Sequence, residues 1–257
     1  EDALILGISG RYEFKNKGID VFIDAMGQLN RNNGLGKEVL AFILVPAGHA
    51  GANKELLHNL ELPYQAVTST DLYLTHYLND SANDPVMNRI RAQKLRNSEE
   101  DKVKIFFVPS YLNGDDGVLN MPYYDLLVGM DLTAFPSYYE PWGYTPLESL
   151  AFKVPTITTT LAGFGLWVKE HYNMNHPGIE VIHREDGDAS NVATAIAEWV
   201  KNYTQVGETE MQKDRDNAKD VSRIALWDNL INYYKQAYTI ALNQVSVRLK
   251  DLPANMN

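Results

Sequence analysis

Short apolar or β-branched runs recur along the chain, and they are closed by Gly, Pro, Ser or a charged residue. Six such runs occupy residues 4–10, 39–46, 104–110, 132–137, 154–160 and 178–184. Continuous runs of this length are typical of strands that are buried on both faces. The pattern therefore predicts six strands.

Between most of these runs the apolar residues recur with helical spacing. In residues 18–30, four apolar side chains share one helical face: Ile19, Phe22, Ile23 and Met26. Residues 123–130 and 145–153 behave similarly. Strands that alternate with helices predict an α/β fold, here a Rossmann-like, doubly wound parallel sheet of about six strands with right-handed crossovers.

The organisation of the rest of the chain is that of one elaborated domain. Residues 50–102 are longer than a minimal crossover and are predicted to be an insertion of helix and charged loop. Three further helices are predicted in residues 189–203, 210–224 and 226–242, and the tail at 250–257 is predicted to be frayed. The chain begins without Met and enters a strand almost at once, so we expect residues 1–257 to be a single domain from something longer.

Composition excludes several classes of function. The chain has 23 basic and 33 acidic residues, a net charge of −10, and its basic residues are scattered, so we expect no nucleic-acid or anionic-lipid partner. It has no cysteine, which excludes disulfides, thiolate metal sites and cysteine nucleophiles and suits a cytoplasmic protein. No apolar run approaches 18 residues, so no membrane span is expected.

Three loops are candidates for building a site, because ligands of such sheets bind beyond the carboxyl ends of the strands. They are residues 9–18, 109–122 and 137–145. The first carries Arg11 and Lys17 before a helix, where free backbone N–H groups and two cations would favour a pyrophosphate. The alternative is that both are solvated surface charges. The loop lacks G-x-G-x-x-G, and no acidic residue follows the second strand, which disfavours a nicotinamide cofactor.

The stretch "SYYEPWGYTPLES", residues 137–149, carries two glutamates with different predicted roles. Thr145 is predicted as an N-cap, Pro146 as the first helical residue and Glu148 as the partner in a capping box. Glu140 has no such structural explanation and is predicted to face the ligand. At about 1.5 Å per helical residue the two carboxylates lie roughly 12 Å apart. The pair of a retaining glycosidase needs about 5 Å, so hydrolysis by this pair is disfavoured.

Three separated motifs then carry a resemblance to a known family. "GRYEFKNKGIDVF", "SYYEPWGYTPLES" and "TTTLAGFG" occur in this order, and together they resemble the C-terminal half of glycogen synthases of the eukaryotic type, in glycosyltransferase family three. The likeness runs from the first strand to about Arg184. It implies a GT-B enzyme, with two Rossmann-like domains, that transfers glucose with retention from UDP-glucose to the non-reducing end of a glucan. This chain would be the donor-binding half, and the glucan acceptor would bind through a missing N-terminal domain.

The resemblance also implies roles for individual residues. Arg11 and Lys17 would hold the donor pyrophosphate in place of a metal, so that no metal and no cofactor is required, and Glu140 would lie beside the donor glucose. The backbone N–H groups of Trp142 and Gly143 would meet sugar hydroxyls. The residues assigned to donor binding are Tyr123, which would stack on uracil, Trp142, Gly143, Tyr144, Thr145, which would touch phosphate, and Glu148, which would bind ribose.

Other interpretations of these residues stay open. Tyr123 could be a packing residue at a helix entry, and Trp142 could brace its turn. Residues 186–188, "DGD", imitate a D-x-D metal signature of a different fold but are interpreted as a turn and helix cap. The whole chain could also belong to a different GT-B transferase or to a nucleotide- or glycan-binding module without catalysis.

One departure from the family concerns regulation. The family has a dense arginine run near its C-terminus that senses glucose 6-phosphate. This chain has four separated cations there, Lys213, Arg215, Lys219 and Arg223, called below the C-terminal cations. Control by a sugar phosphate is therefore not expected. The resemblance allows a homo-oligomer of the full-length enzyme, but the sequence does not give the oligomeric state.

Overall fold

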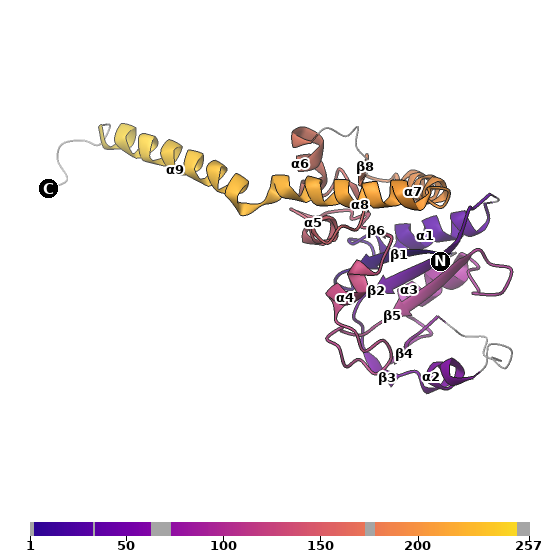
Figure 1. The fold of residues 1–257 in the computed structure, drawn as a ribbon. Coiled ribbons are helices and arrows are strands. Elements are labelled where there is room, and N and C mark those ends of the chain that lie inside the picture. Colours follow the sequence, from indigo (N-terminus) through magenta and orange to yellow (C-terminus); the bar gives the residue numbers. More distant parts are fainter. Residues whose placement is uncertain (1–2, 33, 63–72, 173–177, 251–257) are drawn as a thin grey trace.

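A six-stranded parallel sheet forms the centre of the molecule (Figure 1). The computed structural model describes residues 3–32, 34–62, 73–172 and 178–250. The strands of this sheet are β1 (Ala3–Ser9), β2 (Glu38–Leu44), β5 (Val103–Val108), β6 (Leu132–Ala134), β7 (Thr156–Thr159) and β8 (Ile179–Ile182). They lie in the order β5-β2-β1-β6-β7-β8, and each pair of neighbours is parallel. All six strands lie within or next to the predicted runs, so the predicted fold class is confirmed.

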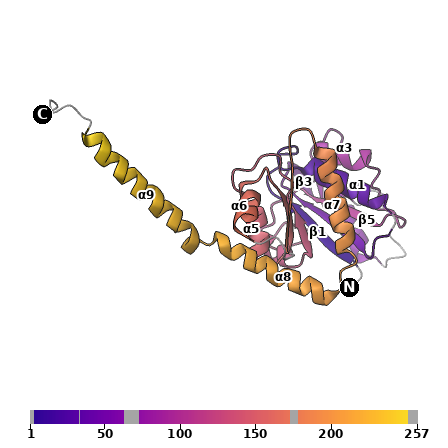
Figure 2. The same cartoon turned by 90° about the horizontal axis from the view of Figure 1, so that it is seen from above.

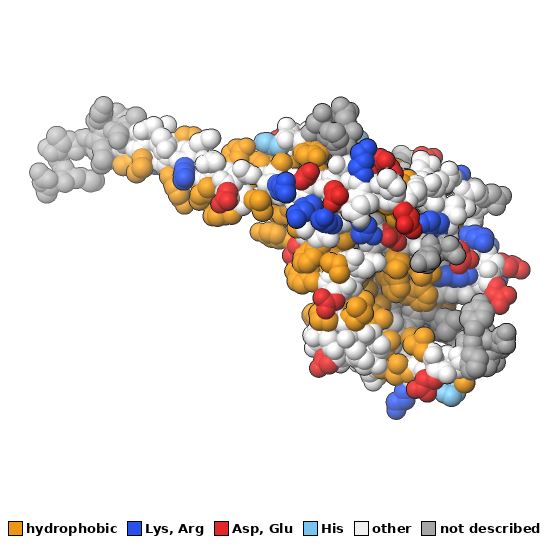
Figure 3. Space-filling view, in the orientation of Figure 1, with side chains coloured by type: hydrophobic (Ala, Val, Ile, Leu, Met, Phe, Trp, Pro, Cys, Tyr) orange, Lys and Arg blue, Asp and Glu red, His pale blue; other side chains and the backbone are white. Residues whose placement is uncertain are grey.

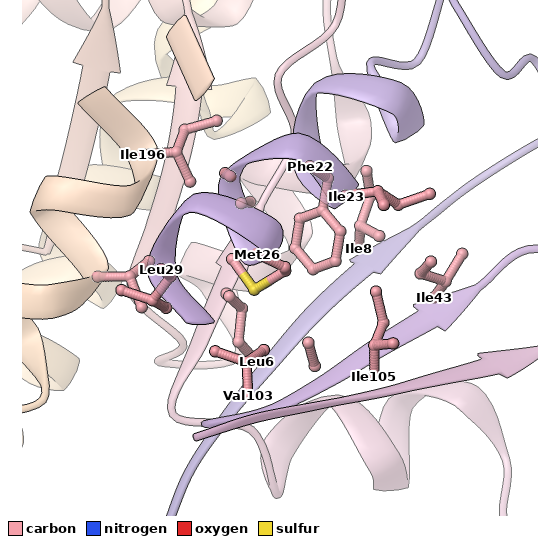
Figure 4. Close-up of a cluster of buried hydrophobic side chains, with 14 of the residues drawn as sticks. Leu6, Ile8, Phe22, Ile23, Met26, Leu29, Ile43, Val103, Ile105 and Ile196 are labelled. Carbon is pink, nitrogen blue, oxygen red and sulfur yellow. The ribbon is translucent and has the colours of Figure 1, made fainter. Parts of the chain in front are cut away.

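Both faces of the sheet are buried, as the continuous apolar runs predict. From β1, Leu4, Leu6 and Ile8 point into a core cluster that also contains side chains of α1 (Ile19–Asn30), α3 (Pro85–Ala92) and α7 (Ala189–Tyr203). The intervening Ile5 packs against a second cluster, which includes Leu127 of α4 (Tyr123–Val128). Figure 4 shows Phe22, Ile23, Met26 and Leu29 of α1 lying on side chains of β1, β2 and β5. The predicted apolar face of residues 18–30 is therefore the core face.

The insertion between β2 and β5 differs in part from the prediction of helix and loop. It contains α2 (Lys54–Glu61) and α3, but also a small antiparallel sheet of β3 (His49–Ala52) and β4 (His76–Leu78). These strands have only four and three residues, "HAGA" and "HYL", so they carry no alternating apolar pattern that could have indicated them.

The three C-terminal helices are present where the sequence predicts them: α7 is followed by α8 (Glu208–Ser222), a 3₁₀ turn (Arg223–Ala225) and α9 (Trp227–Lys250). A further helix that was not predicted, α6 (Gly163–His171), lies between β7 and β8. Figures 1 and 2 show α9 leaving the domain as an arm, and it is longer than predicted. Most of the tail predicted to be frayed, residues 251–257, lies outside the described residues.

The order of the strands contains one topological switch point. The chain winds from β1 outward to β2 and β5, and then returns to place β6, β7 and β8 on the other side of β1. The loops after β1 and β6 therefore leave neighbouring strands in opposite directions, which opens a crevice at their carboxyl ends. α5 (Tyr144–Ala151) begins shortly after β6 and points its amino terminus toward this crevice.

Candidate functional site

A cleft of about 310 Å³ lies at the switch point and brings the three predicted loops together. We call it the switch-point cleft, and it is lined by Ser9, Gly10, Leu44, Pro46, residues 110–113, Tyr123 and Thr145. The loop after β5 closes on itself at its base, because the N–H of Tyr123 donates to the carbonyl of Leu112 at 3.0 Å. Sequence reasoning found this loop but none of residues 110–113, since none of them carries a charge.

The turns after β1 and β6 are in direct contact with each other. The N–H of Tyr138 donates to the carbonyl of Asn16 at 2.8 Å. Gly18 has φ +69°, and a Cβ there would lie 2.6 Å from the carbonyl carbon of Pro136. Glycine is therefore required at this position by both its backbone conformation and the close approach of the Pro136 backbone.

Lys17 and Glu140 form an ion pair across these two turns. Their side chains are only 15% and 21% exposed, so water screens the pair incompletely. The backbone of Glu140 is fixed on both sides: its N–H donates to Leu161 at 3.2 Å, and its carbonyl accepts from the N–H of Gly163 at 3.0 Å. The structure thus brings together two residues, 123 positions apart, that the sequence assigned to one site.

Arg11 does not join them in this structure. Its guanidinium pairs with Glu13 at 3.0 Å, and its side chain is 78% exposed. Within the described residues its guanidinium forms no hydrogen bond or ion pair with Lys17 or Glu140. Its geometry matches the alternative interpretation, a solvated surface charge, although the side chain lies on a loop of the site.

The predicted capping box at the start of α5 is wrong. The N-cap is Gly143, with φ +109°, and no side chain caps the helix. Thr145 therefore lies inside the first turn and lines the switch-point cleft. The reason is that only glycine adopts the Gly143 conformation readily, so the chain enters the helix before Thr145. In the part of the chain that the structure describes, the N–H groups of residues 142–145 have no protein acceptor. Four consecutive free donors at a helix amino terminus favour an anion or an electron-rich ligand.

Glu148 has a different partner from the one predicted. Its Oε1 accepts a hydrogen bond from the hydroxyl of Tyr124 at 3.4 Å, and that ring stacks on Phe152 with centroids 4.9 Å apart. Burial raises the pKa of the Glu148 carboxyl above its ordinary value, while the Tyr124 hydrogen bond lowers it. Glu148 is therefore a half-buried carboxylate on α5, the helix whose residue Thr145 lines the switch-point cleft.

Tyr123 packs in the core, as one of its two interpretations expects, and it also lines the switch-point cleft. It is the first residue of α4, and its ring packs against the core cluster that contains Leu127. Its hydroxyl lies 2.7 Å from Oγ of Ser9, and the residue lines the switch-point cleft. Burial raises the pKa of this phenol. Ser9, which sequence reasoning missed, could have been noticed as the polar residue that ends β1.

Trp142 and Tyr144 direct their side chains elsewhere. The Trp142 ring packs edge-on against Phe164 and lies 6.0 Å from the Trp167 ring, as expected for a residue that braces its turn. Both residues line a second cleft between α5, α6 and α9. We call it the aromatic cleft, after its six aromatic residues Trp142, Tyr144, Trp167, Trp227, Tyr233 and Tyr234.

Arg184 contacts the turn after β6, which precedes Glu140, and it was not predicted as part of the site. It is 5% exposed, and its guanidinium donates to the carbonyl of Pro136. It also lies 5.5 Å from the ring centre of Tyr138. Burial lowers the pKa of this guanidinium below its ordinary value. Its position at the end of the predicted strand 178–184 was the only signal in the sequence.

The described residues contain neither a cluster of metal-ligating side chains nor a membrane-spanning helix. They contain no group of three or more His, Cys, Asp or Glu side chains that could hold a metal ion. Residues 186–188 form a turn before α7, as predicted, with Gly187 at φ +84°, but the Asp188 side chain caps nothing. Among the helices described, none is long and apolar enough to cross a membrane.

Three of the C-terminal cations are paired with carboxylates. Lys213 pairs with Glu210 at 3.3 Å, Arg215 with Asp131 at 2.9 Å and Arg223 with Asp220 at 2.9 Å. They therefore do not form a shared cluster of free positive charge.

Comparison with known proteins gives a consistent picture. A family model described as glycogen synthase matches residues 1–69 and 64–254. The chain is 28% identical over 307 residues to glycogen [starch] synthase isoform 2 of Saccharomyces cerevisiae, covering 95% of this chain and 44% of the yeast protein. It is 29% identical over 299 residues to glycogen [starch] synthase of Neurospora crassa, covering 95% and 42%. It is 27% identical over 295 residues to the liver enzyme of Rattus norvegicus, covering 95% and 42%. The chain thus spans less than half the length of these relatives.

Proposed function

Since the chain belongs to the glycogen synthase family, we propose that it forms the half of such an enzyme that binds the glucose donor, UDP-glucose. The enzyme would be a retaining glycosyltransferase of the GT-B type that extends α-1,4-glucan chains in the cytoplasm. The observation that carries the proposal is the Lys17–Glu140 ion pair beside the free N–H groups of residues 142–145, at the switch point of the sheet.

The positive groups of this site suit a departing nucleotide. A leaving UDP gains negative charge as the bond between glucose and phosphate breaks. Lys17 and the free amino terminus of α5 offer fixed positive charge and aligned dipoles, which act most strongly where water is partly excluded. These groups come from the protein, so no metal ion is needed for this role. Tyr123 and Thr145, on the wall of the switch-point cleft, would contact the nucleotide.

Glu140 suits the sugar side of the same bond. Glucose becomes cationic when the nucleotide leaves, and a carboxylate beside it stabilises that charge. Lys17 and Glu140 would then act on opposite sides of the bond that breaks. Because the two side chains are in direct contact, we expect the bond that breaks to lie within reach of both.

The remaining groups of the reaction would come from the part of the enzyme that this chain does not contain. The acceptor glucan would approach from a second domain across the crevice, so we expect the 257-residue chain to bind donor but transfer no glucose. Donors with another nucleotide, such as ADP-glucose, are the main alternative, since the residues named here bind phosphate and sugar and do not by themselves select a base.

The proposal is tested by the thermal stability of the chain with and without UDP. At about 100 times its dissociation constant a ligand stabilises the folded state by ~2.7 kcal/mol. At roughly 2–4 °C per kcal/mol for a domain of this size, the melting temperature should rise by about 5–10 °C. The rise should be the same in EDTA, and ADP should give a smaller one.

Two variants of the same turn give a matched comparison. Lys17→Met removes the cation of the site, and we expect it to abolish most of the UDP shift. Lys15→Met removes a cation two positions away, which is 79% exposed and pairs with Asp20, and should leave the shift unchanged. No UDP shift in the unaltered chain, or equal losses in the two variants, would contradict the proposed donor site.

A further inference from the structure

Arg184 is a buried cation in a chain whose other cations lie mostly at the surface. On the face shown in Figure 3, Lys and Arg side chains lie at the surface beside Asp and Glu side chains. Arg184 is 5% exposed, and in the part of the chain that the structure describes no carboxylate forms an ion pair with it. A buried charge without a direct counter-charge lowers stability, so its presence favours a role other than stabilising the fold.

Two carboxylates act on the Arg184 guanidinium without direct contact. Burial lowers the pKa of the guanidinium, and the charges of Asp20 on α1 and Asp188 before α7 raise it in part. Asp20 pairs instead with Lys15, at 2.9 Å. Among the described residues, Nε of Arg184 and Oδ1 of each of the two aspartates are buried without a hydrogen-bond partner. The position of the guanidinium therefore depends on its direct contacts.

These direct contacts are with the turn after β6. The guanidinium donates to the carbonyl of Pro136 and lies 5.5 Å from the ring centre of Tyr138. The carbonyl of Pro136 is also the group that Gly18 approaches, and the N–H of Tyr138 donates to the carbonyl of Asn16 at 2.8 Å. Arg184 thus contacts two residues that both touch the turn after β1.

The backbone of Arg184 is anchored to the end of β7. Its N–H donates to Oγ1 of Thr160 at 3.0 Å, and the hydroxyl of Thr160 donates to the carbonyl of Arg184 at 3.3 Å. The N–H of Thr160 donates in turn to the carbonyl of Ile182 at 3.0 Å. The planar guanidinium therefore extends from a fixed backbone, which suits it to hold a carbonyl group in place.

The two turns that Arg184 connects carry the ion pair of the proposed donor site. The backbone of Glu140 has its own hydrogen bonds to the loop before α6. We propose that Arg184 is a positioning residue of this site: through Pro136 and Tyr138 it holds the turn of Lys17 against Glu140. The inference rests on the proposed function, because donor binding is what makes the relative position of these two side chains matter.

The affinity of the 257-residue chain for UDP tests this role. Arg184→Met removes the charge and the donors but keeps an unbranched side chain, and it should weaken UDP binding about tenfold. Arg184→Lys keeps a cation that can donate to Pro136, and it should restore most of the lost affinity. Calorimetry is done at a temperature at which circular dichroism shows each variant to be folded. A merely structural role would lower the melting temperature and leave the affinity of the folded chain unchanged.

Arg215→Met is the matched control at the opposite end of β6. Arg215 is also mostly buried, and it donates to the carbonyl of Met130, just before the strand, at 3.1 Å. Its removal should leave the UDP affinity unchanged, although it also breaks the ion pair with Asp131. Equal weakening of UDP binding in Arg184→Met and Arg215→Met would overturn the proposal, because it would show a general effect of losing an arginine.

A double-mutant cycle tests whether Arg184 acts through Lys17. If it does, adding Arg184→Met to Lys17→Met should weaken UDP binding by less than about twofold, because the side chain that Arg184 positions is already gone. Independent effects of the two substitutions on UDP affinity would overturn the proposal.

Amide hydrogen exchange followed by NMR gives a test that needs no ligand. In Arg184→Met the N–H of Tyr138, which donates to Asn16 in the other turn, should exchange about tenfold faster. The N–H of Glu140, which donates to Leu161, should keep its exchange rate and is the internal control. Unchanged exchange at Tyr138 would overturn the proposal.

UDP binding by the unaltered chain separates this inference from the proposed function. No UDP binding there overturns the proposed function, and with it the role of Arg184 in donor binding. Normal UDP binding by the unaltered chain and by Arg184→Met alike overturns the role of Arg184 alone.

Discussion

Gly18 offers the sharpest test of how the site is held together, because an alanine there introduces two separate costs. The first is conformational: φ is +69°, and an L-residue in the left-handed region costs about 1–2 kcal/mol. The second is steric, because the new Cβ would overlap the carbonyl of Pro136. Overpacking of this kind typically costs about 1–3 kcal/mol.

Gly187 separates the two costs. It has φ +84°, and a Cβ there would meet nothing within 4 Å, so Gly187→Ala carries the conformational cost alone. Gly18→Ala should therefore be less stable than Gly187→Ala by about 1–3 kcal/mol. This difference in stability should lie toward the upper end of that range if the overlap also breaks the hydrogen bond that the buried guanidinium of Arg184 donates to the carbonyl of Pro136.

Thermal and urea unfolding of the two variants measure this difference. At roughly 2–4 °C per kcal/mol, Gly18→Ala should melt about 2–12 °C below Gly187→Ala. The UDP shift should weaken in Gly18→Ala only, since the turn that carries Lys17 must move away from the turn that carries Glu140. Equal melting temperatures for the two variants would refute the close contact between these turns.

Three further predictions concern charge. In the full-length enzyme, Glu140→Gln should lower kcat by 10²-fold or more, about 2.7 kcal/mol, and leave UDP affinity unchanged. Glu148→Gln should instead weaken donor binding. The same kinetic defect in both variants would contradict these roles. Asp214 is 3% exposed, and burial, with a smaller effect of Glu210, raises its pKa to about 6. The unfolded carboxyl ionises near pH 4, so the folded state loses stability as the pH rises from about 4 to 6. In urea unfolding, Asp214→Asn should therefore raise the free energy of unfolding by about 1–3 kcal/mol at pH 7 and leave it unchanged near pH 4. An equal gain at pH 4 and pH 7 would exclude the charge as the cause. Glucose 6-phosphate should stimulate the full-length enzyme less than tenfold in a glucose-transfer assay, because three of the C-terminal cations are already paired.

Much of the fold can be predicted from local patterns in the sequence. Six apolar runs predict the six strands, since a strand buried on both faces must be apolar throughout. The face formed by Ile19, Phe22, Ile23 and Met26 predicts the core side of α1, because helical spacing brings these residues together without help from the rest of the chain. The three-loop site also follows, because parallel strands place their carboxyl ends at one edge.

Other features depend on residues that meet only after folding. The start of α5 is decided by Gly143, whose conformation overrides the T-P-x-E pattern, so Glu148 bonds with Tyr124 and caps nothing. The β3–β4 pair consists of strands too short to carry a pattern, and they are stabilised by each other.

The features of the site also fall into two groups, those that the sequence predicts and those that depend on the tertiary structure. The sequence determined which residue types stand in each loop, because a cation, a carboxylate and a glycine are properties of single positions. Only the tertiary structure decided that Lys17 pairs with Glu140, that Arg11 turns to Glu13, and that Trp142 and Tyr144 open a second cleft. The physical reason is that the Lys17–Glu140 pair joins segments 123 positions apart, and that the second cleft needs α5, α6 and α9 side by side. These arrangements are set by the packing of the whole sheet and its helices.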